Sequence, residues 1–273
     1  MTYTQATAGK RVTEHELRQE MVRVGRLMWE RGYVAATDGN LSARLGRDRL
    51  LVTPSGLSKG FLSAAELVVM RIDGQLVARY GGREQKPSSE IAMHLEVYRQ
   101  RSDVRAIVHA HPPLATAFSI AGLSLARCVI PEVIVTLGGI PTTEYATPGT
   151  GEVPESIAQA IRDYDAIILA HHGSLTLGQS LWEAYLRLEK VEHTAKITLA
   201  AHQLGQVNTL SPDQVAKLAE QRRELLQREG RDLCADCSLC VLGNDYQPLV
   251  DTQDTDALVR QVSQAVMKNL QER

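Results

Sequence analysis

The chain of 273 residues lacks the features of nucleic-acid-binding, membrane and secreted disulfide-rich proteins. Its formal net charge is −2 and only 4% of its residues are aromatic, so it has neither a basic field nor a platform for stacked bases. No apolar run approaches the roughly 20 residues of a membrane span. Four cysteines, three of them clustered, do not resemble a secreted disulfide framework, and residues 1–10 lack the apolar segment of a signal peptide. We therefore expect a cytoplasmic protein.

Apolar spacing predicts a mixed fold in which strands do not alternate regularly with helices. Thr13 is placed to cap the first helix and Gly32 to end it. Helices are expected at 14–31, 89–99, 113–121, 153–162, 181–204 and 211–229, and strands or strand-like segments at 50–53, 67–72, 75–78, 104–109, 131–139 and 165–170. This pattern favours an α/β fold, either three-layer α/β/α or α+β, around a mainly antiparallel sheet flanked by helices.

Histidines follow two of the expected strands. His109 and His111 stand at i and i+2, so their side chains share one face of a strand. His172 follows the strand at 165–170, and Glu90 ends the segment Pro87-Ser88-Ser89-Glu90. Three histidines and one carboxylate suit a catalytic Zn²⁺, or another divalent ion, that keeps one coordination position open. The alternative for each histidine alone is an ordinary residue at a strand end.

The pair His171-His172 does not by itself say which ring binds. We favour His172 because the adjacent Gly173 lets the backbone crowd a site, and we expect His171 to have a structural or supporting role. The remaining histidines lie in helical patterns and are interpreted as ordinary surface or interface residues: His15, His94, His193 and His202.

Three polar turns are candidates for binding an anion. The turns are Asp38-Gly39-Asn40, Thr53-Pro54-Ser55-Gly56 and Ser88-Ser89. Each offers backbone N–H groups with short hydroxyl or amide side chains, and Ser88-Ser89 also stand where a helix begins. The alternative is that these are common turns and that Ser88 or Ser89 is only a helix cap.

A divalent cation beside an anion site suggests chemistry at a carbon next to a carbonyl. The cation would polarise the carbonyl and stabilise a metal-bound enediolate. Glu90 could move the proton as a general acid and base. These groups would serve aldol cleavage, decarboxylation, epimerisation or hydrolysis.

These motifs resemble those of the class II aldolase/adducin family from about residue 14 to residue 228. The resemblance rests on ordered segments at compatible spacing: Gly39-Asn40-Leu41-Ser42, Thr53-Pro54-Ser55-Gly56, Pro87-Ser88-Ser89-Glu90, His109-Ala110-His111-Pro112, Tyr145-Ala146-Thr147-Pro148-Gly149-Thr150 and His171-His172-Gly173. Within the family, the motifs are most similar to those of aldolases that act on L-fuculose 1-phosphate.

The resemblance implies a site and an activity. It implies one Zn²⁺ per subunit on His109, His111, His172 and Glu90, with Glu90 also catalytic, and phosphate binding by Gly39, Asn40, Ser55, Gly56, Ser88 and Ser89. It further implies cleavage of a phosphorylated deoxyketose, such as L-fuculose 1-phosphate, into dihydroxyacetone phosphate and L-lactaldehyde. A homotetramer with active sites at subunit interfaces is expected. The alternative is a decarboxylase or 4-epimerase of a sugar or sugar-acid phosphate on the same metal scaffold.

Two positions bear on the choice among relatives. Sister 4-epimerases carry an aspartate where this chain has Glu90, which favours an aldolase. Aldolases of this family have an interface tyrosine that protonates the aldehyde oxygen, at the place where this chain has Glu132. The group that protonates the aldehyde half of the substrate is therefore left open.

The C-terminal region has a different character. We expect a catalytic domain at 1–232, a linker at 233–255 with Cys234, Cys237 and Cys240, and an amphipathic helix at 256–273. The helix resembles encapsulation peptides that direct enzymes into bacterial microcompartments by binding a shell protein. The alternative is a helix that packs on its own subunit or on a neighbour in the tetramer. The cysteines could hold a second metal or an iron–sulfur cluster, or could simply pack.

Overall fold

The computed structural model describes residues 12–78 and 85–231 of the chain. The three-part division at 232 and 255 therefore stays a prediction. The linker at 233–255, its cysteines Cys234, Cys237 and Cys240, and the helix at 256–273 lie outside the described residues.

One antiparallel sheet forms the middle of the molecule. Its strand order is β4-β3-β2-β1-β5-β7-β6, and every pair of neighbouring strands is antiparallel. The strands are β1 (Asn40–Arg44), β2 (Arg49–Val52), β3 (Val68–Arg71), β4 (Leu76–Ala78), β5 (Ala106–Ala110), β6 (Ala166–Leu169) and β7 (Gly173–Gly178). Strand β5 is an interior strand between β1 and β7, so its end is flanked by backbone on both sides.

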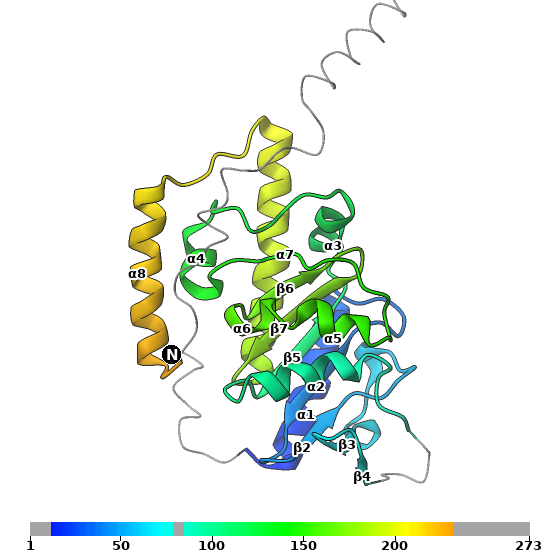
Figure 1. Ribbon diagram of the computed structural model, residues 1–273. Helices are drawn as coiled ribbons and strands as arrows, with labels where there is room; N and C mark the ends of the chain where they lie inside the picture. Colours follow the sequence, from blue (N-terminus) through cyan, green and yellow to red (C-terminus); the bar gives the residue numbers. More distant parts are fainter. Residues whose placement is uncertain (1–11, 79–84, 232–273) are drawn as a thin grey trace, which may run out of the picture.

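Helices cover both faces of the sheet, which confirms the three-layer α/β/α prediction (Figure 1). The helices are α1 (Glu14–Glu30), η2 (Lys59–Phe61), η3 (Ala64–Glu66), α2 (Ile91–Gln100), α3 (Pro113–Ile120), α4 (Pro131–Leu137), α5 (Glu152–Ile157), α6 (Ala160–Asp163), α7 (Leu181–Leu204) and α8 (Pro212–Arg228). Helices α1 and α7 pack on one face, and α2, α5 and α6 pack on the other.

Each face of the sheet is sealed by its own apolar core. Alternating residues of β1 and β5, such as Leu41 and Val108, pack against α1 and α7. Ile107, the neighbour of Val108, points the opposite way and packs with Val97 of α2. This alternation with a period of two is what a strand with two buried faces requires.

The first helix follows its sequence signals closely. Thr13 caps α1, and Thr13 and Glu16 form a reciprocal capping box. Gly32 follows the helix at a φ of 71°, a conformation that favours glycine. The predicted N-cap is therefore confirmed.

Three expectations about the elements were wrong or incomplete. Residues 131–139 form helix α4 instead of a strand, because Pro131 occupies the first helical turn and the buried Val133, Ile134 and Leu137 follow helical spacing. The helix expected at 153–162 is two shorter helices, α5 and α6. Strand β7, which pairs with both β5 and β6, was missed.

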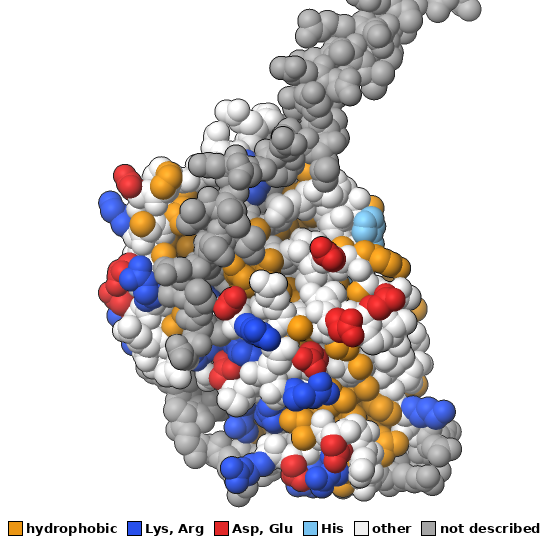
Figure 2. All heavy atoms as spheres, in the orientation of Figure 1, with side chains coloured by type: hydrophobic (Ala, Val, Ile, Leu, Met, Phe, Trp, Pro, Cys, Tyr) orange, Lys and Arg blue, Asp and Glu red, His pale blue; other side chains and the backbone are white. Residues whose placement is uncertain are grey.

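The surface seen in Figure 2 carries basic and acidic side chains that are interspersed rather than gathered by sign. This arrangement agrees with the near-neutral net charge of −2. Within 12–78 and 85–231, none of the helices is both long enough and apolar enough to cross a membrane.

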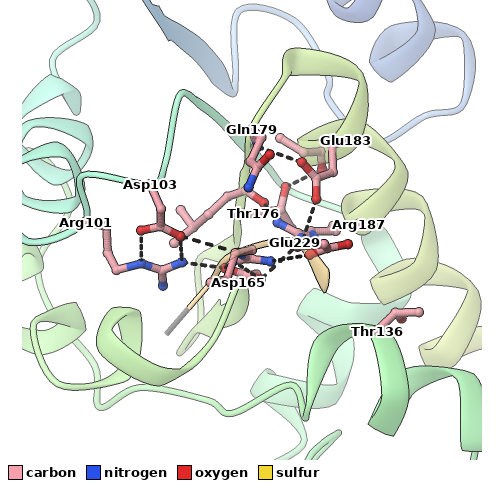
Figure 3. A network of polar contacts seen from close by, with 12 residues as sticks. Arg101, Asp103, Thr136, Asp165, Thr176, Gln179, Glu183, Arg187 and Glu229 are labelled. Carbon is pink, nitrogen blue, oxygen red and sulfur yellow. Dashed lines mark hydrogen bonds and ion pairs between the residues drawn. The ribbon is translucent and has the colours of Figure 1, made fainter. Parts of the chain in front are cut away.

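A buried carboxylate ties the C-terminal end of α8 to the sheet (Figure 3). Asp165, at the start of β6, is fully buried and accepts hydrogen bonds from Arg101 at 2.9 Å and from Arg231 at 2.6 Å. Arg187 of α7 lies 3.3 Å from the same carboxylate. Burial opposes the charge, but Arg187, Arg231 and Arg101 outweigh it and lower the pKa of Asp165 to about 2.

We predict that Asp165→Asn destabilises the fold by about 3–5 kcal/mol near neutral pH, because it leaves buried guanidinium groups without their counter-charge. The lowered pKa means that Asp165 stabilises the fold fully above its usual pKa of 3.8, and that this contribution is lost as the pH falls toward 2. The difference between wild type and variant should therefore shrink below pH 4 when unfolding is followed in urea. Asp48→Asn, which removes an exposed ion pair with Arg71, should cost less than about 1 kcal/mol. Equal effects of the two substitutions would contradict the prediction.

Candidate metal centre and anion-binding turns

Four side chains from four segments meet at one end of the sheet. His109 is in β5, His111 follows that strand, His172 is in the β6–β7 turn, and Glu90 immediately precedes α2. One ligand atom from each residue lies within 4.8 Å of every other. The three imidazole rings are 4.8–4.9 Å apart between centroids, so they surround one point.

The ring of His109 is oriented by the strand beside it. Its Nδ1 lies 2.9 Å from the carbonyl oxygen of Ser174 in β7, which can accept only if Nδ1 carries the proton. With Nδ1 engaged in this way, Nε2 points into the cluster, where the Nε2 atom of His111 is 3.1 Å away. Burial, followed by the neighbouring His109 and His172, lowers the pKa of His111 to about 3, so the ring of His111 is neutral.

The β6–β7 turn brings His172 to the cluster through a close backbone approach. A Cβ atom on Gly173 would lie 2.3 Å from the carbonyl oxygen of Ala110 and 2.7 Å from the ring of His111. Only glycine allows this approach, as expected from the sequence. His171 is exposed, has a φ of 57°, and donates its backbone N–H to Ser119 at 3.1 Å, while its ring faces Tyr145. His171 therefore stands outside the cluster.

Glu90 faces the histidines and does not cap its own helix. Its carboxylate lies 3.0 Å from His172 Nε2 and 3.3 Å from His109 Nε2, and it accepts a hydrogen bond from the Asn40 amide at 2.9 Å. Burial raises the pKa of Glu90, but its contacts with His109 and His172 outweigh burial and hold the pKa well below the usual range. The group is therefore an anion next to the imidazole nitrogens.

Three imidazole nitrogens and one carboxylate form a donor set that fits a divalent metal ion. The neutral ring of His111 offers a lone pair, and the ionised Glu90 supplies a negative charge. The cluster is therefore able to bind a metal.

The three predicted anion-binding turns lie next to one another beside this cluster. Asn40 begins β1 and pairs directly with His109 of β5. Thr53, at the end of β2, bonds the backbone of Leu41 next to Asn40. An isolated bridge between Pro54 and Pro87 then joins the second turn to the third. The fold thus links the three turns through neighbouring backbone, and Asn40 of the first turn lies against both His109 and Glu90.

Some N–H groups of these turns are already engaged. The N–H of Ser55 donates to Lys86 at 2.9 Å, and the N–H of Ser88 donates to Thr53 at 3.3 Å. Ser88 Oγ accepts from the backbone of Glu90, which is itself the cap residue of α2, so neither serine is the N-cap. The hydroxyl of Ser55 and the exposed Gly56 and Ser89 are the groups that face solvent.

Sequence reasoning missed a buried cation near these turns. Lys59 is 2% exposed, and its ammonium donates to the carbonyls of Thr37 at 2.7 Å and Leu57 at 2.6 Å. Burial lowers the pKa of Lys59 to about 8, whereas the charges of Asp38 and Glu90 favour its ionised form. Lys59 thereby links Thr37, just before the first turn, to Leu57, just after the second turn.

Two further residues differ in role from their sequence interpretation or remain apart from the cluster. His94 is fully buried in α2 instead of lying at the surface, and its Nδ1 lies 2.6 Å from Ser42 Oγ. Helical spacing alone could not show that this position faces β1. Glu132 is exposed in the first turn of α4 and does not belong to the four-residue cluster.

The family profile described as "Class II Aldolase and Adducin N-terminal domain" matches residues 19–199. The chain belongs to the class II aldolase and adducin family. The resemblance inferred from the motifs is thus confirmed, and the match includes all four cluster residues.

Similar proteins include some named as aldolases and some named as decarboxylases. It is 34% identical over 185 residues, 68% of this chain and 97% of the relative, to the L-fuculose phosphate aldolase of Methanococcus maripaludis. It is 35% identical over 188 residues, 67% of this chain and 86% of the relative, to the 3-oxo-tetronate 4-phosphate decarboxylase of Escherichia coli K12.

Solved structures show the same fold. YgbL from Klebsiella pneumoniae matches with a TM-score of 0.70 at 34% identity, covering 76% of this chain and 100% of YgbL. A structure of L-fuculose 1-phosphate aldolase matches with a TM-score of 0.69 at 33% identity, covering 76% and 96% of the two chains. This chain is accordingly an enzyme of the class II aldolase type with a cluster able to bind a metal.

We predict that the two adjacent histidines differ in metal binding. His172→Asn should weaken Zn²⁺ binding by more than about 100-fold, because even outer partners of metal ligands typically contribute 10–100-fold. His171→Asn should leave the affinity within about threefold of wild type, since asparagine tolerates the left-handed backbone found there. Competition with a chromogenic chelator measures both affinities. The assignment fails if His171→Asn is the variant that loses the metal.

Proposed function

We propose that this enzyme is a zinc-dependent aldolase that cleaves a phosphorylated deoxyketose, such as L-fuculose 1-phosphate, into dihydroxyacetone phosphate and L-lactaldehyde. The observation that carries the proposal is the position of the Glu90–histidine cluster directly beside the three polar turns. In this proposal, Glu90, His109, His111 and His172 hold Zn²⁺, one ion per subunit.

The three turns would hold the phosphate group. Neutral hydrogen-bond donors and the start of α2 can bind an anion without a direct arginine or lysine contact. Gly39, Asn40, Ser55, Gly56, Ser88 and Ser89 are the residues we assign to this group. Lys59, which bridges the flanks of two turns, adds a nearby positive charge.

Glu90 is the proposed acid and base. When bound, Zn²⁺ supplies Lewis-acid polarisation of the substrate carbonyl. Cleavage removes a hydroxyl proton, breaks the carbon–carbon bond and leaves the dihydroxyacetone phosphate half one proton short at carbon. The Glu90 carboxylate, held between Asn40 and two histidines, would take up the hydroxyl proton and pass it to that carbon.

A decarboxylase of a sugar-acid phosphate, or a 4-epimerase, is the second candidate. Two observations favour keeping it. A relative of nearly equal identity is named a 3-oxo-tetronate 4-phosphate decarboxylase. In addition, Glu132 stands where the resemblance leads one to expect a tyrosine that serves the aldehyde. A decarboxylase releases CO₂ from a carboxylate and has no hydroxyl proton to transfer at that end of the substrate.

We predict that the zinc-loaded enzyme releases dihydroxyacetone phosphate from at least one of L-fuculose 1-phosphate, L-rhamnulose 1-phosphate and 5-deoxyribulose 1-phosphate. Coupling to glycerol-3-phosphate dehydrogenase measures the product, and 3-oxo-tetronate 4-phosphate is tested in parallel for CO₂ release. Glu90→Gln should lower kcat by about 10²–10⁴-fold, the usual contribution of a general acid or base.

The matched control is Glu220→Gln, which changes an exposed residue of α8 and should leave kcat unchanged. Release of CO₂ without any dihydroxyacetone phosphate would replace the aldolase proposal by the decarboxylase. A pentulose epimer would replace it by the epimerase.

We further propose a homotetramer with active sites at its subunit interfaces, and a cytoplasmic location in which residues 256–273 bind a microcompartment shell protein. The support for the second proposal is the apolar stripe of the sequence, which includes Leu258, Val262 and Val266. Confinement would suit a reaction that releases a reactive aldehyde.

Deletion of residues 251–273 should leave kcat unchanged and abolish co-purification with shells, because the apolar stripe that a shell groove would bury is gone. Replacing Arg260 and Lys268, on the opposite arc, by Gln should preserve co-purification and serves as the control. Entry of the truncated enzyme into shells would refute this role of the tail.

A further inference from the structure

A row of polar side chains lies between α2 and β1 and begins at Glu90, one of the four residues of the candidate metal site. On α2 and its cap, Glu90 and His94 are four residues apart and share one helix face. On β1, Asn40 and Ser42 are two residues apart and share one strand face. The two pairs meet one to one: Asn40 bonds Glu90 at 2.9 Å, and Ser42 bonds His94 at 2.6 Å.

The row continues away from the cluster. The hydroxyl of Tyr98, one turn beyond His94, lies 2.9 Å from the same Ser42 hydroxyl. Arg44, two residues beyond Ser42, donates to the backbone carbonyl of Tyr98 at 2.7 Å. Three successive turns of α2 are thus joined to three successive inward positions of β1.

This interface departs from the rest of the α2 contact, which is apolar. Met93 and Val97 of α2 pack against Leu50 and Ile107 of the sheet. Apolar contacts are not directional, so they permit small slides of a helix along a sheet. Hydrogen bonds fix distance and angle. The polar row therefore determines where the first turn of α2, and with it Glu90, lies relative to β1.

The burial of His94 argues for this role over simple packing. The side chain is fully buried, and its Nε2 makes no hydrogen bond among the residues that the structure describes. A buried polar nitrogen without a partner is unfavourable, and an apolar residue could fill the same space without that penalty. The bond from Nδ1 to Ser42 is what a leucine at this position could not provide.

We propose that His94 is a positioning residue: its bond to Ser42 holds α2 against β1 and so fixes the position of the Glu90 carboxylate among the three histidines. The inference rests on the proposed function, because Glu90 is there both a ligand and the proton carrier. His94 itself touches neither the metal nor the substrate in this proposal. Tyr98 supports the same serine from one turn farther away.

The test compares substitutions of His94 by two residues of different chemistry. His94→Leu keeps the bulk and loses the bond to Ser42, so Co²⁺ affinity should fall about 10–100-fold, as for other partners of metal ligands. Its kcat should fall with KM changed by less than about threefold, because a displaced Glu90 affects the chemical step. His94→Asn can place an amide near the position of Nδ1 and should restore most of both losses.

Co²⁺ affinity and its visible absorption spectrum are measured on the full chain after removal of bound metal, so this readout needs no substrate. Circular dichroism and thermal unfolding confirm that each variant is folded. His15→Leu, the same substitution on an exposed position of α1, is the control and should change neither affinity nor kcat. Should His94→Leu fail to fold, Ser42→Ala removes the partner hydroxyl and should show the same loss of affinity.

A folded His94→Leu with the Co²⁺ affinity and spectrum of wild type would overturn the inference. So would a His94→Asn variant no better than His94→Leu. Failure of the proposed function is separate: the wild type would then release no dihydroxyacetone phosphate, while the Co²⁺ measurements would still support or refute the role of His94.

Discussion

The close approach of the β6–β7 turn to the end of β5 is the contact on which the site depends. Gly173 has no side chain, so the turn can lie against the carbonyl of Ala110, where a Cβ atom would be only 2.3 Å away. This contact brings His172 to the two histidines of β5. Because β5 is an interior strand, its end is fixed from both sides, by Asn40 of β1 and by Ser174 of β7. The cluster is therefore built mainly by strand pairing.

Asp165 and the partly buried Glu90 both have a lowered pKa, but the two carboxylates have different roles. Asp165 is surrounded by arginines, whose permanent charge makes a stable structural anion. Glu90 is surrounded by histidines, whose charge depends on protonation and on what their nitrogens bind. A guanidinium has no lone pair with which to bind a metal ion, whereas a neutral imidazole has one. Partner chemistry, more than burial, thus separates a structural anion from a candidate catalytic one.

Local sequence patterns were sufficient to predict features that depend on a single helix or strand. The i, i+2 spacing of His109 and His111 placed both rings on one strand face, and Thr13 marked the start of α1. Tertiary context decided the rest. The apolar residues of α4 suit a strand as well as a helix until Pro131 is seen at the first turn. The role of His94 depends on Ser42, 52 residues away, which helical periodicity cannot reveal.

The scaffold fixes the place where negative charge develops in the substrate. It does not by itself decide whether an aldehyde or CO₂ is released. Aldol cleavage and decarboxylation both break a bond to carbon beside a carbonyl, and both need a cation there with an acid nearby. Glu90 and the histidines meet that shared requirement. The reactions differ on the far side of the broken bond, where aldol cleavage must remove a hydroxyl proton to form the aldehyde, whereas decarboxylation starts from an ionised carboxylate and releases CO₂. Specificity within this family must therefore come from residues outside the cluster, and exposed positions such as Glu132 can change without disturbing the cluster histidines.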